Sequence, residues 1–193
     1  MGTAPVIARG STCVVASLKK MPSLGAAPLG VKIATASSRG VRIIDAATGV
    51  VTFRTAPDFE APADADGDNV YDLVVTASDG TTATDQSVQV TVTNGNDNAP
   101  VITSAASASV AENQSAALDV DATDPDGDTL SYSLSGTDAA LFTIDSGTGV
   151  VTFRTAPDFE NPADADGDNV YELTVTASDG TTATDQTVQV TVT

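Results

Sequence analysis

The stretch that decides the fold is residues 150–193, VVTFRTAPDFENPADADGDNVYELTVTASDGTTATDQTVQVTVT, because the chain contains it twice. Residues 50–93 have nearly the same sequence, one hundred positions earlier in the 193-residue chain. A period near 100 residues is too long for a solenoid repeat and has the size of an autonomous β-sandwich. The copies differ at four places: Ala61/Asn161, Asp72/Glu172, Val74/Thr174 and Ser87/Thr187.

Alternating apolar and polar residues predict strands along the second repeat. Residues 118–123, 130–134 and 171–177 alternate, and Val188, Val190 and Val192 complete the repeat. Extended segments are also expected at 100–111, 142–144 and 151–153, with turns at 146–149 and 179–180. Seven short strands that are rich in Thr and Val predict an all-β sandwich, and no segment has a helical period.

The front half of the first repeat is different. Residues 1–44 contain six basic residues and no acid, whereas residues 45–193 contain 26 acids and two bases. Residues 8–42 lack the alternation of the second repeat, so either they are a diverged half-domain or they are not native repeat sequence. We expect them to be the least well-ordered segment. The expected divisions are a basic segment at 1–43, the rest of repeat 1 with its linker at 44–98, and repeat 2 at 99–193.

Composition excludes several classes of function. His is absent and Cys13 is the only cysteine, which removes His-dependent catalysis, His-ligated zinc and an intrachain disulfide. The net charge of −18 makes nucleic acids and anionic membranes poor partners and cations good ones. No apolar run is long enough to insert into a membrane. The N-terminus is a poor secretory signal, so we expect any export signal to lie elsewhere in a longer protein.

The acids are concentrated in loops between the predicted strands. Carboxylates and Asn carbonyls at alternate positions suit a hard cation that takes six to eight oxygen ligands. Asp, Asn and Gly also form turns without any ion, and that is the simpler interpretation of one isolated loop. Several such loops without basic partners favour a cation, because the carboxylates would otherwise repel one another. The loops are 94–98, 124–128, 58–60 with 158–160, and 77–80 with 177–180.

These loops, in this order, resemble the cadherin repeat. The linker 94–100 matches the cadherin pattern DxNDNAP except that Asn94 replaces its first Asp, and residues 111–113 match the AEN element. Asp-Phe-Glu at 58–60 and 158–160 is similar to the DRE element. Asp124 and Asp126 match DxD, and residues 77–80 and 177–180 match AxDG. The near-identical copies, rich in Ala, Thr and Asp, look like bacterial cadherin-like surface proteins.

The resemblance implies tandem seven-stranded Greek-key sandwiches, joined end to end, with calcium bound at their junction. Ser17 lies where the first repeat would supply the Glu of its AEN element, so that ligand is missing. The junction ligands carried over are Asp58, Glu60, Asn94, Asn96, Asp97, Asn98, Asp124, Asp126 and Asp179. A second set, Glu112, Asp158 and Glu160, would serve a junction at the other end of repeat 2.

The resemblance further implies a non-enzymatic, extracellular protein at a cell surface that mediates calcium-dependent adhesion. Candidate partners are calcium ions and identical or related repeats on other molecules. The alternative is a calcium-rigidified passive stalk that holds another module away from the cell. An enzyme with paired carboxylates is the least favoured class, because the acids lie in repeated loops and no aromatic platform for sugar is visible.

One acidic loop has no counterpart in animal cadherins. Residues 64–69 and 164–169 both have the sequence DADGDN, with acids at positions 1, 3 and 5 as in an EF-hand loop. Gly at position 4 and Val75 at position 12 depart from that motif. Two interpretations stay open: a further weak calcium site, or a solvated acidic turn.

Overall fold

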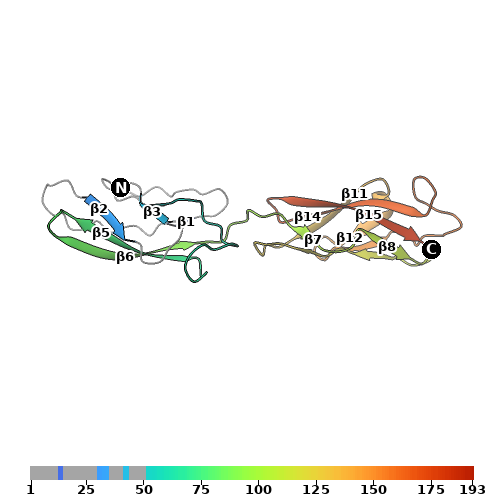
Figure 1. The fold of residues 1–193 in the computed structure, drawn as a ribbon. Helices are drawn as coiled ribbons and strands as arrows, with labels where there is room; N and C mark the ends of the chain where they lie inside the picture. Colours follow the sequence, from blue (N-terminus) through green and yellow to red (C-terminus); the bar gives the residue numbers. More distant parts are fainter. Residues whose placement is uncertain (1–12, 15–29, 35–40, 44–50) are drawn as a thin grey trace. The chain divides into compact units, whose positions relative to one another are not determined.

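The computed structural model describes residues 13–14, 30–34, 41–43 and 51–193, and side chains from residue 51 onward. The chain divides into two compact units, Met1–Gly95 and Asn96–Thr193. Almost all regular structure in the described residues is β-strand, with a single 3₁₀ turn, η1, at Ala139–Leu141 (Figure 1). No helix among the described residues has the length and apolar character needed to cross a membrane.

The second unit is built from two main layers, in which every strand pair is antiparallel except β8 with β15. One sheet has the order β11-β14-β15-β8 and the other has the order β12-β13-β9, while a short ribbon joins β10 to β7. The long central pair, β14 and β15, is antiparallel in continuous register over nine residue pairs. The strands are β7 (Val101–Ile102), β8 (Ser107–Val110), β9 (Ala116–Asp119), β10 (Ala122–Thr123), β11 (Ser131–Ser135), β12 (Phe142–Ile144), β13 (Val150–Phe153), β14 (Val170–Ser178) and β15 (Ala183–Val192).

Two of the predicted strands are interrupted. The predicted strand 118–123 divides into β9 and β10, because Val120 donates its N–H to the Gly149 carbonyl while Asp121 accepts from Thr103. The opening segment divides into β7 and β8, and β8 pairs in parallel with β15. When each divided strand is counted once, the unit has seven strands, and the all-β sandwich is confirmed.

The core of the second unit follows the predicted alternation. Tyr171, Leu173, Val175 and Ala177 on β14 are at most 1% exposed, as are alternate valines on β15. Tyr171 contacts Phe142 and Phe153 edge to face, with ring centroids 5.6 and 5.3 Å apart. Such aromatic pairs contribute about 0.5–1.5 kcal/mol each beyond the area they bury.

One glycine is required by a close backbone approach. Gly149 has φ +79°, and a Cβ atom there would lie 2.2 Å from the carbonyl oxygen of Val120. The predicted turn at 146–149 therefore brings β13 against the interrupted strand β9–β10. This contact fixes the edge of the smaller sheet.

In the first unit, the described strands form the sheet β1-β6-β5-β2 and the pair β3-β4. Strand β2 pairs with β5 as β11 pairs with β14: Ile33 faces Val75, and Leu134 faces Val175. The strand at the outer edge differs, because β1 is antiparallel to β6 whereas β8 is parallel to β15. The strands are β1 (Cys13–Val14), β2 (Gly30–Ala34), β3 (Val41–Ile43), β4 (Val51–Phe53), β5 (Val70–Ser78) and β6 (Ala83–Val92).

Most of residues 8–42, which we predicted to be the least well-ordered segment, lie outside the described residues. Of that segment, the structure describes β1, β2 and two residues of β3. The choice between a diverged half-domain and non-native sequence therefore stays open.

Candidate metal centres

The acidic loop after β10 is tied to the start of the second unit by Asp126. Its Oδ2 accepts the N–H groups of Asp97 and Asn98 at 3.0 and 2.8 Å, and its Oδ1 accepts the Asn98 amide at 2.9 Å. The Asn98 amide also lies 3.1 Å from Asp97 Oδ1. The predicted linker ligands and the predicted DxD pair are therefore neighbours within this unit.

Around Asp126, some oxygens are left without donors. Asp124 Oδ1 accepts the N–H groups of Asp126 and Asp128, at 2.9 and 3.2 Å, whereas its Oδ2 is buried without a partner. Asn96 donates its amide to the Asp179 carbonyl at 3.4 Å, and its own Oδ1 is also buried without a partner. Buried oxygens that lack a donor are what a bound cation would satisfy.

Asp128 is a member of this group that the predicted set omitted. One carboxylate oxygen each from Asp124, Asp126 and Asp128 lies within 4.8 Å of the others. The strict i, i+2, i+4 spacing of acids in the loop is the signal that could have identified it.

Asp179 was predicted as a ligand, and its carboxylate has local partners. Its Oδ1 accepts the N–H groups of Thr181 and Thr182, both at 2.6 Å, and Thr182 Oγ1 donates to Oδ2 at 2.7 Å. These bonds, led by the Thr182 N–H, hold the pKa of Asp179 below its ordinary value. Asp179 belongs to no acidic cluster in the described part of the chain, and its carboxylate closes the β14–β15 turn.

The predicted ligands of the first unit lie in the loop after β4 and beyond β6. Asp58 Oδ1 accepts the N–H groups of Glu60 and Ala61 at 3.0 and 3.1 Å. Asn69 donates its side-chain amide to the carbonyl of Phe59, which connects this loop to the start of β5. Asn94 follows β6 and is exposed.

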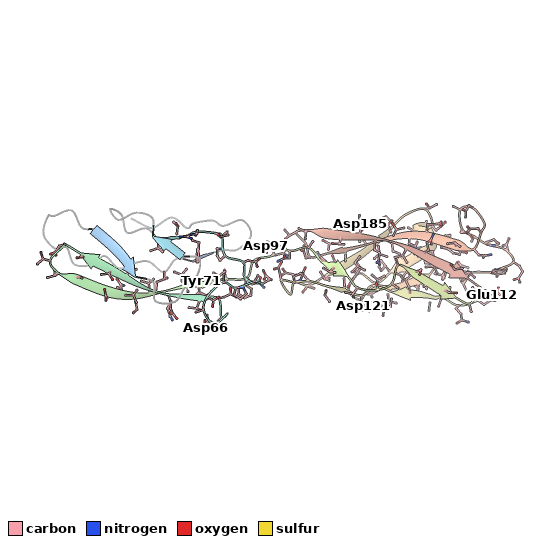
Figure 2. The ribbon with its side chains drawn as sticks, in the orientation of Figure 1. Asp66, Tyr71, Asp97, Glu112, Asp121 and Asp185 are labelled. Carbon is pink, nitrogen blue, oxygen red and sulfur yellow. The ribbon has the colours of Figure 1, made fainter. Side chains whose placement is uncertain are left out.

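The second predicted set comes together at the far end of the second unit. Figure 2 shows Glu112 and Asp97 at opposite ends of that unit. Carboxylate oxygens of Glu112, Asp158 and Glu160 lie within 4.8 Å of one another. Glu112 Oε2 accepts the Phe159 N–H, and Asp158 Oδ1 accepts the Glu160 N–H, both at 3.1 Å. The AEN and DFE elements, 47 positions apart, thus form one acidic group.

Residues 106–193 match the family model of the cadherin domain. The second unit is a cadherin domain. Over most of the chain, the fold agrees with solved structures of protocadherins. The protocadherin gammaB7 EC3-6 cis-dimer structure has a TM-score of 0.66 at 21% identity, over 95% of this chain and 49% of that one. Human protocadherin-24 EC1-2 has a TM-score of 0.66 at 23% identity, over 86% and 82%.

Two curated proteins are similar in sequence. Chitinase A of Pseudoalteromonas piscicida is 38% identical over 123 residues, which is 63% of this chain. Protocadherin Fat 4 of Homo sapiens is 31% identical over 155 residues, which is 75% of this chain. The chain spans 14% of the first protein and 3% of the second.

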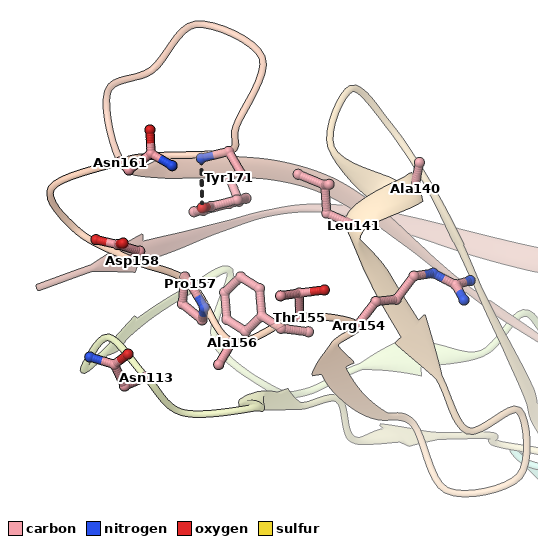
Figure 3. Close-up of a pocket in the computed structure, with 12 residues that line it drawn as sticks. Asn113, Ala140, Leu141, Arg154, Thr155, Ala156, Pro157, Asp158, Asn161 and Tyr171 are labelled. Atoms are coloured by element: carbon pink, nitrogen blue, oxygen red, sulfur yellow. Dashed lines mark hydrogen bonds between the residues drawn. The ribbon is translucent and has the colours of Figure 1, made fainter.

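A pocket of about 560 Å³ opens beside the DFE loop of the cadherin domain (Figure 3). Phe153, Pro157 and Tyr171 form its apolar side, and the Ala163 N–H donates to the Tyr171 hydroxyl at 3.4 Å. Asp158 is the one carboxylate in its lining as described.

The DADGDN loops form acidic groups in both units. Carboxylate oxygens of Asp64, Asp66 and Asp68 lie within 4.8 Å of one another, as do those of Asp164, Asp166 and Asp168. The Asp164 side chain and the charge of Asp168 raise the pKa of Asp166. In the first unit, repulsion from Asp68 is the main cause of the raised pKa of Asp66. The loops therefore hold like charges close together in each unit.

Proposed function

We propose that the chain is part of an exported surface protein whose cadherin domains bind calcium at their junction and mediate calcium-dependent adhesion. The observation that supports this best is the Asp126 network. It draws Asp97 and Asn98 of the linker against the DxD loop, beside the buried and unpartnered oxygens of Asp124 and Asn96. All of the donor atoms are oxygens, as calcium requires.

The residues of the predicted junction set divide into two groups. Asn96, Asp97, Asn98, Asp124, Asp126 and Asp179 would bind calcium from the cadherin domain. Asp58, Glu60 and Asn94 would bind it from the first unit. Calcium would supply positive charge to a region in which residues 45–193 carry a net charge of −24. The chain's own part is to hold carboxylates and amide oxygens in place through Asp126 and the local turns.

The mechanism we infer is stiffening of the linker. Without a cation, the carboxylates of the two units repel each other, and the linker stays free to bend. Ligands contributed by both units would link them through the ion, and the binding free energy would stabilise the folded, joined form. A row of such junctions would present an adhesive surface at a fixed distance from the cell.

A passive stalk is the second candidate. The similarity to a segment of Chitinase A shows that related sequence occurs within a protein that is named as an enzyme. In such a protein the repeats would serve as a calcium-stiffened spacer. The enzymatic part would then lie elsewhere, since we propose no catalytic role for this chain.

Sedimentation velocity of the full chain, with calcium and with a chelator, tests the adhesion proposal. Adhesion between identical repeats predicts self-association that appears only with calcium. A chain that binds calcium and stays monomeric at every concentration would contradict homophilic adhesion and favour the stalk. A chain that binds no calcium in a parallel calorimetric titration would contradict both proposals.

A further inference from the structure

The acids of the loop 164–169 in the cadherin domain belong to neither predicted set of calcium ligands and form an acidic group of their own. It joins the DFE loop to β14 and contains Asp164, Asp166 and Asp168, whose carboxylate oxygens lie within 4.8 Å of one another. Asp166 and Asp168 are exposed, whereas Asp164 is only 8% exposed. A carboxylate is rarely buried to this extent unless it has a partner.

Asp164 has a partner for only one of its two oxygens. Its Oδ2 accepts the N–H of Asp168 at 2.8 Å and closes the loop. Its Oδ1 is buried and has no hydrogen-bond partner. An ionised carboxylate can only accept hydrogen bonds, so a buried and unpaired oxygen is costly unless a donor or a cation meets it. The ionised carboxylates of Asp166 and Asp168 can only accept hydrogen bonds as well, and the Asn169 side-chain amide donates to the carbonyl of Phe159 instead.

Contacts from outside the acidic group hold the loop in this shape. Asp138 is 3% exposed and lies next to η1. Its Oδ1 accepts the N–H of Ala165 and its Oδ2 accepts the N–H of Glu172, at 2.9 and 2.8 Å. Within the loop, Gly167 has φ +77°, a conformation that glycine adopts without strain. The acids are thus held together by the fold.

We propose that Asp164, Asp166 and Asp168 bind a calcium ion within the cadherin domain, separately from the junction. The three carboxylates supply oxygen ligands only, and the loop contains no nitrogen or sulfur ligand that would favour zinc or copper. A cation there would satisfy Asp164 Oδ1 and neutralise the repulsion between the acids. Because the loop is already anchored, less conformational entropy is lost on binding.

The first unit contains the same loop, but none of its described residues bonds to that loop as Asp138 bonds to the loop 164–169. Asp64 Oδ2 accepts the Asp68 N–H at 2.8 Å, and Asp64 Oδ1 is likewise buried and unpartnered. Asp64 as a whole is less buried than Asp164. The positions 100 and 101 before Asp138 are both serine, Ser38 and Ser37, and neither has a carboxylate. We therefore expect the loop of the cadherin domain to bind calcium more tightly than the loop of the first unit.

Calorimetric titration of the full chain with calcium tests this site through Asp166→Asn, Asp66→Asn and the double variant. Asp166 and Asp66 are exposed loop residues outside both cores, so folding should not depend on them. Asp121→Asn, an exposed acid in none of the acidic clusters found among the described residues, is the matched control. Asp166→Asn should weaken or abolish the binding of one calcium ion per chain, and the double variant should weaken or abolish the binding of two. Asp121→Asn should bind calcium as the parent chain does.

A second readout locates the ion. In a calcium titration of the full chain followed by NMR, the amide resonances of residues 164–170 should shift in the parent and in Asp97→Ala, and not in Asp166→Asn. If Asp166→Asn retains the calcium number, the affinity and these shifts, the loop site is wrong. The junction is judged separately, because Asp97→Ala should remove calcium that Asp166→Asn retains. Failure of either proposal therefore leaves the other standing.

Discussion

Residues 50–93 and 150–193 differ at four positions, yet they bury the same side chains to different degrees. Phe153 is 5% exposed and Val188 is fully buried, whereas Phe53 and Val88 are only partly buried. Nearly identical sequences cannot cause this difference by themselves. The cause therefore lies outside the shared half, and the two repeats differ most in the sequence of their front halves. Burial is therefore a property of the partner strands as much as of the residue itself.

Truncation of Phe153 and of Phe53 should give the largest difference in stability between the two repeats. Phe153 packs against Phe142 and Tyr171, so Phe153→Ala should cost about 3–5 kcal/mol in the free energy of unfolding. The ring centroids of Phe53 and Tyr71 lie 4.9 Å apart, but Phe53 is less buried than Phe153. Phe53→Ala should therefore lower the free energy of unfolding by less. Hydrogen exchange of peptides from β14 and β5, read by mass spectrometry, measures each unit by itself. Equal losses of protection in the two variants would contradict the comparison.

Removal of calcium should have the next largest effect. A ligand that binds only the folded form adds RT ln(1 + [L]/Kd), about 2.7 kcal/mol at a hundredfold excess over Kd. The melting temperature should rise by roughly 10 °C between chelator and millimolar calcium. Magnesium at the same concentration is the control for ionic strength. A melting temperature that is unchanged by calcium would contradict every calcium site proposed for this chain.

Asp138→Asn sharpens the comparison between the two acidic loops. The asparagine amide cannot accept the second backbone N–H, so a buried donor is left unpaired, at a cost of about 1–3 kcal/mol. The cadherin domain should lose stability, and the loop 164–169 should bind calcium more weakly. The loop 64–69 should be unaffected and serves as the internal control. If calcium affinity in the loop 164–169 does not change, Asp138 does not preorganise that loop.

The strands and the acidic groups were predictable from the sequence because they depend on short spacings. Alternation located β11, β14 and β15, and acids two positions apart marked the groups in the loops 64–68, 124–128 and 164–168, whereas the group of Glu112 with Asp158 and Glu160 was expected from the resemblance to the cadherin repeat. Contacts between distant residues could not be found in this way. The hydrogen bond from the Ala165 N–H to Asp138 joins residues 27 positions apart. The interruption between strands β9 and β10 depends on the hydrogen bond from Val120 to Gly149.

The edge strands show the same limit. Nothing in the local pattern of residues 13–14 specifies that β1 is antiparallel to β6, while β8 is parallel to β15. The AxDG element also gives no sign that the Asp179 carboxylate accepts the N–H groups of Thr181 and Thr182, and its role as a calcium ligand stays a prediction. Spacing identifies candidate ligands, but only the fold shows which oxygens are already partnered.

The turn at Asp145 should give the smallest effect, and it depends on pH. Its Oδ1 accepts the N–H groups of Gly147 and Thr148, both at 2.9 Å, and these bonds lower the pKa of Asp145. A lowered folded-state pKa gives stability that is present above the ordinary Asp value and is lost as pH falls through the folded value. Asp145→Asn should therefore melt slightly below the parent at pH 7, and the difference should disappear in acid. A difference that persists at pH 2 would contradict this account of Asp145.

The central claim is that calcium at the junction stiffens the linker between the units. Small-angle X-ray scattering of the full chain in chelator and in millimolar calcium tests it most directly, with Asp97→Ala as the variant and Asp121→Asn as the control. The account predicts a narrower distribution of shapes for the parent and for Asp121→Asn in calcium, with both units still folded in Asp97→Ala but a broader distribution. Identical scattering of the parent chain with and without calcium would contradict it.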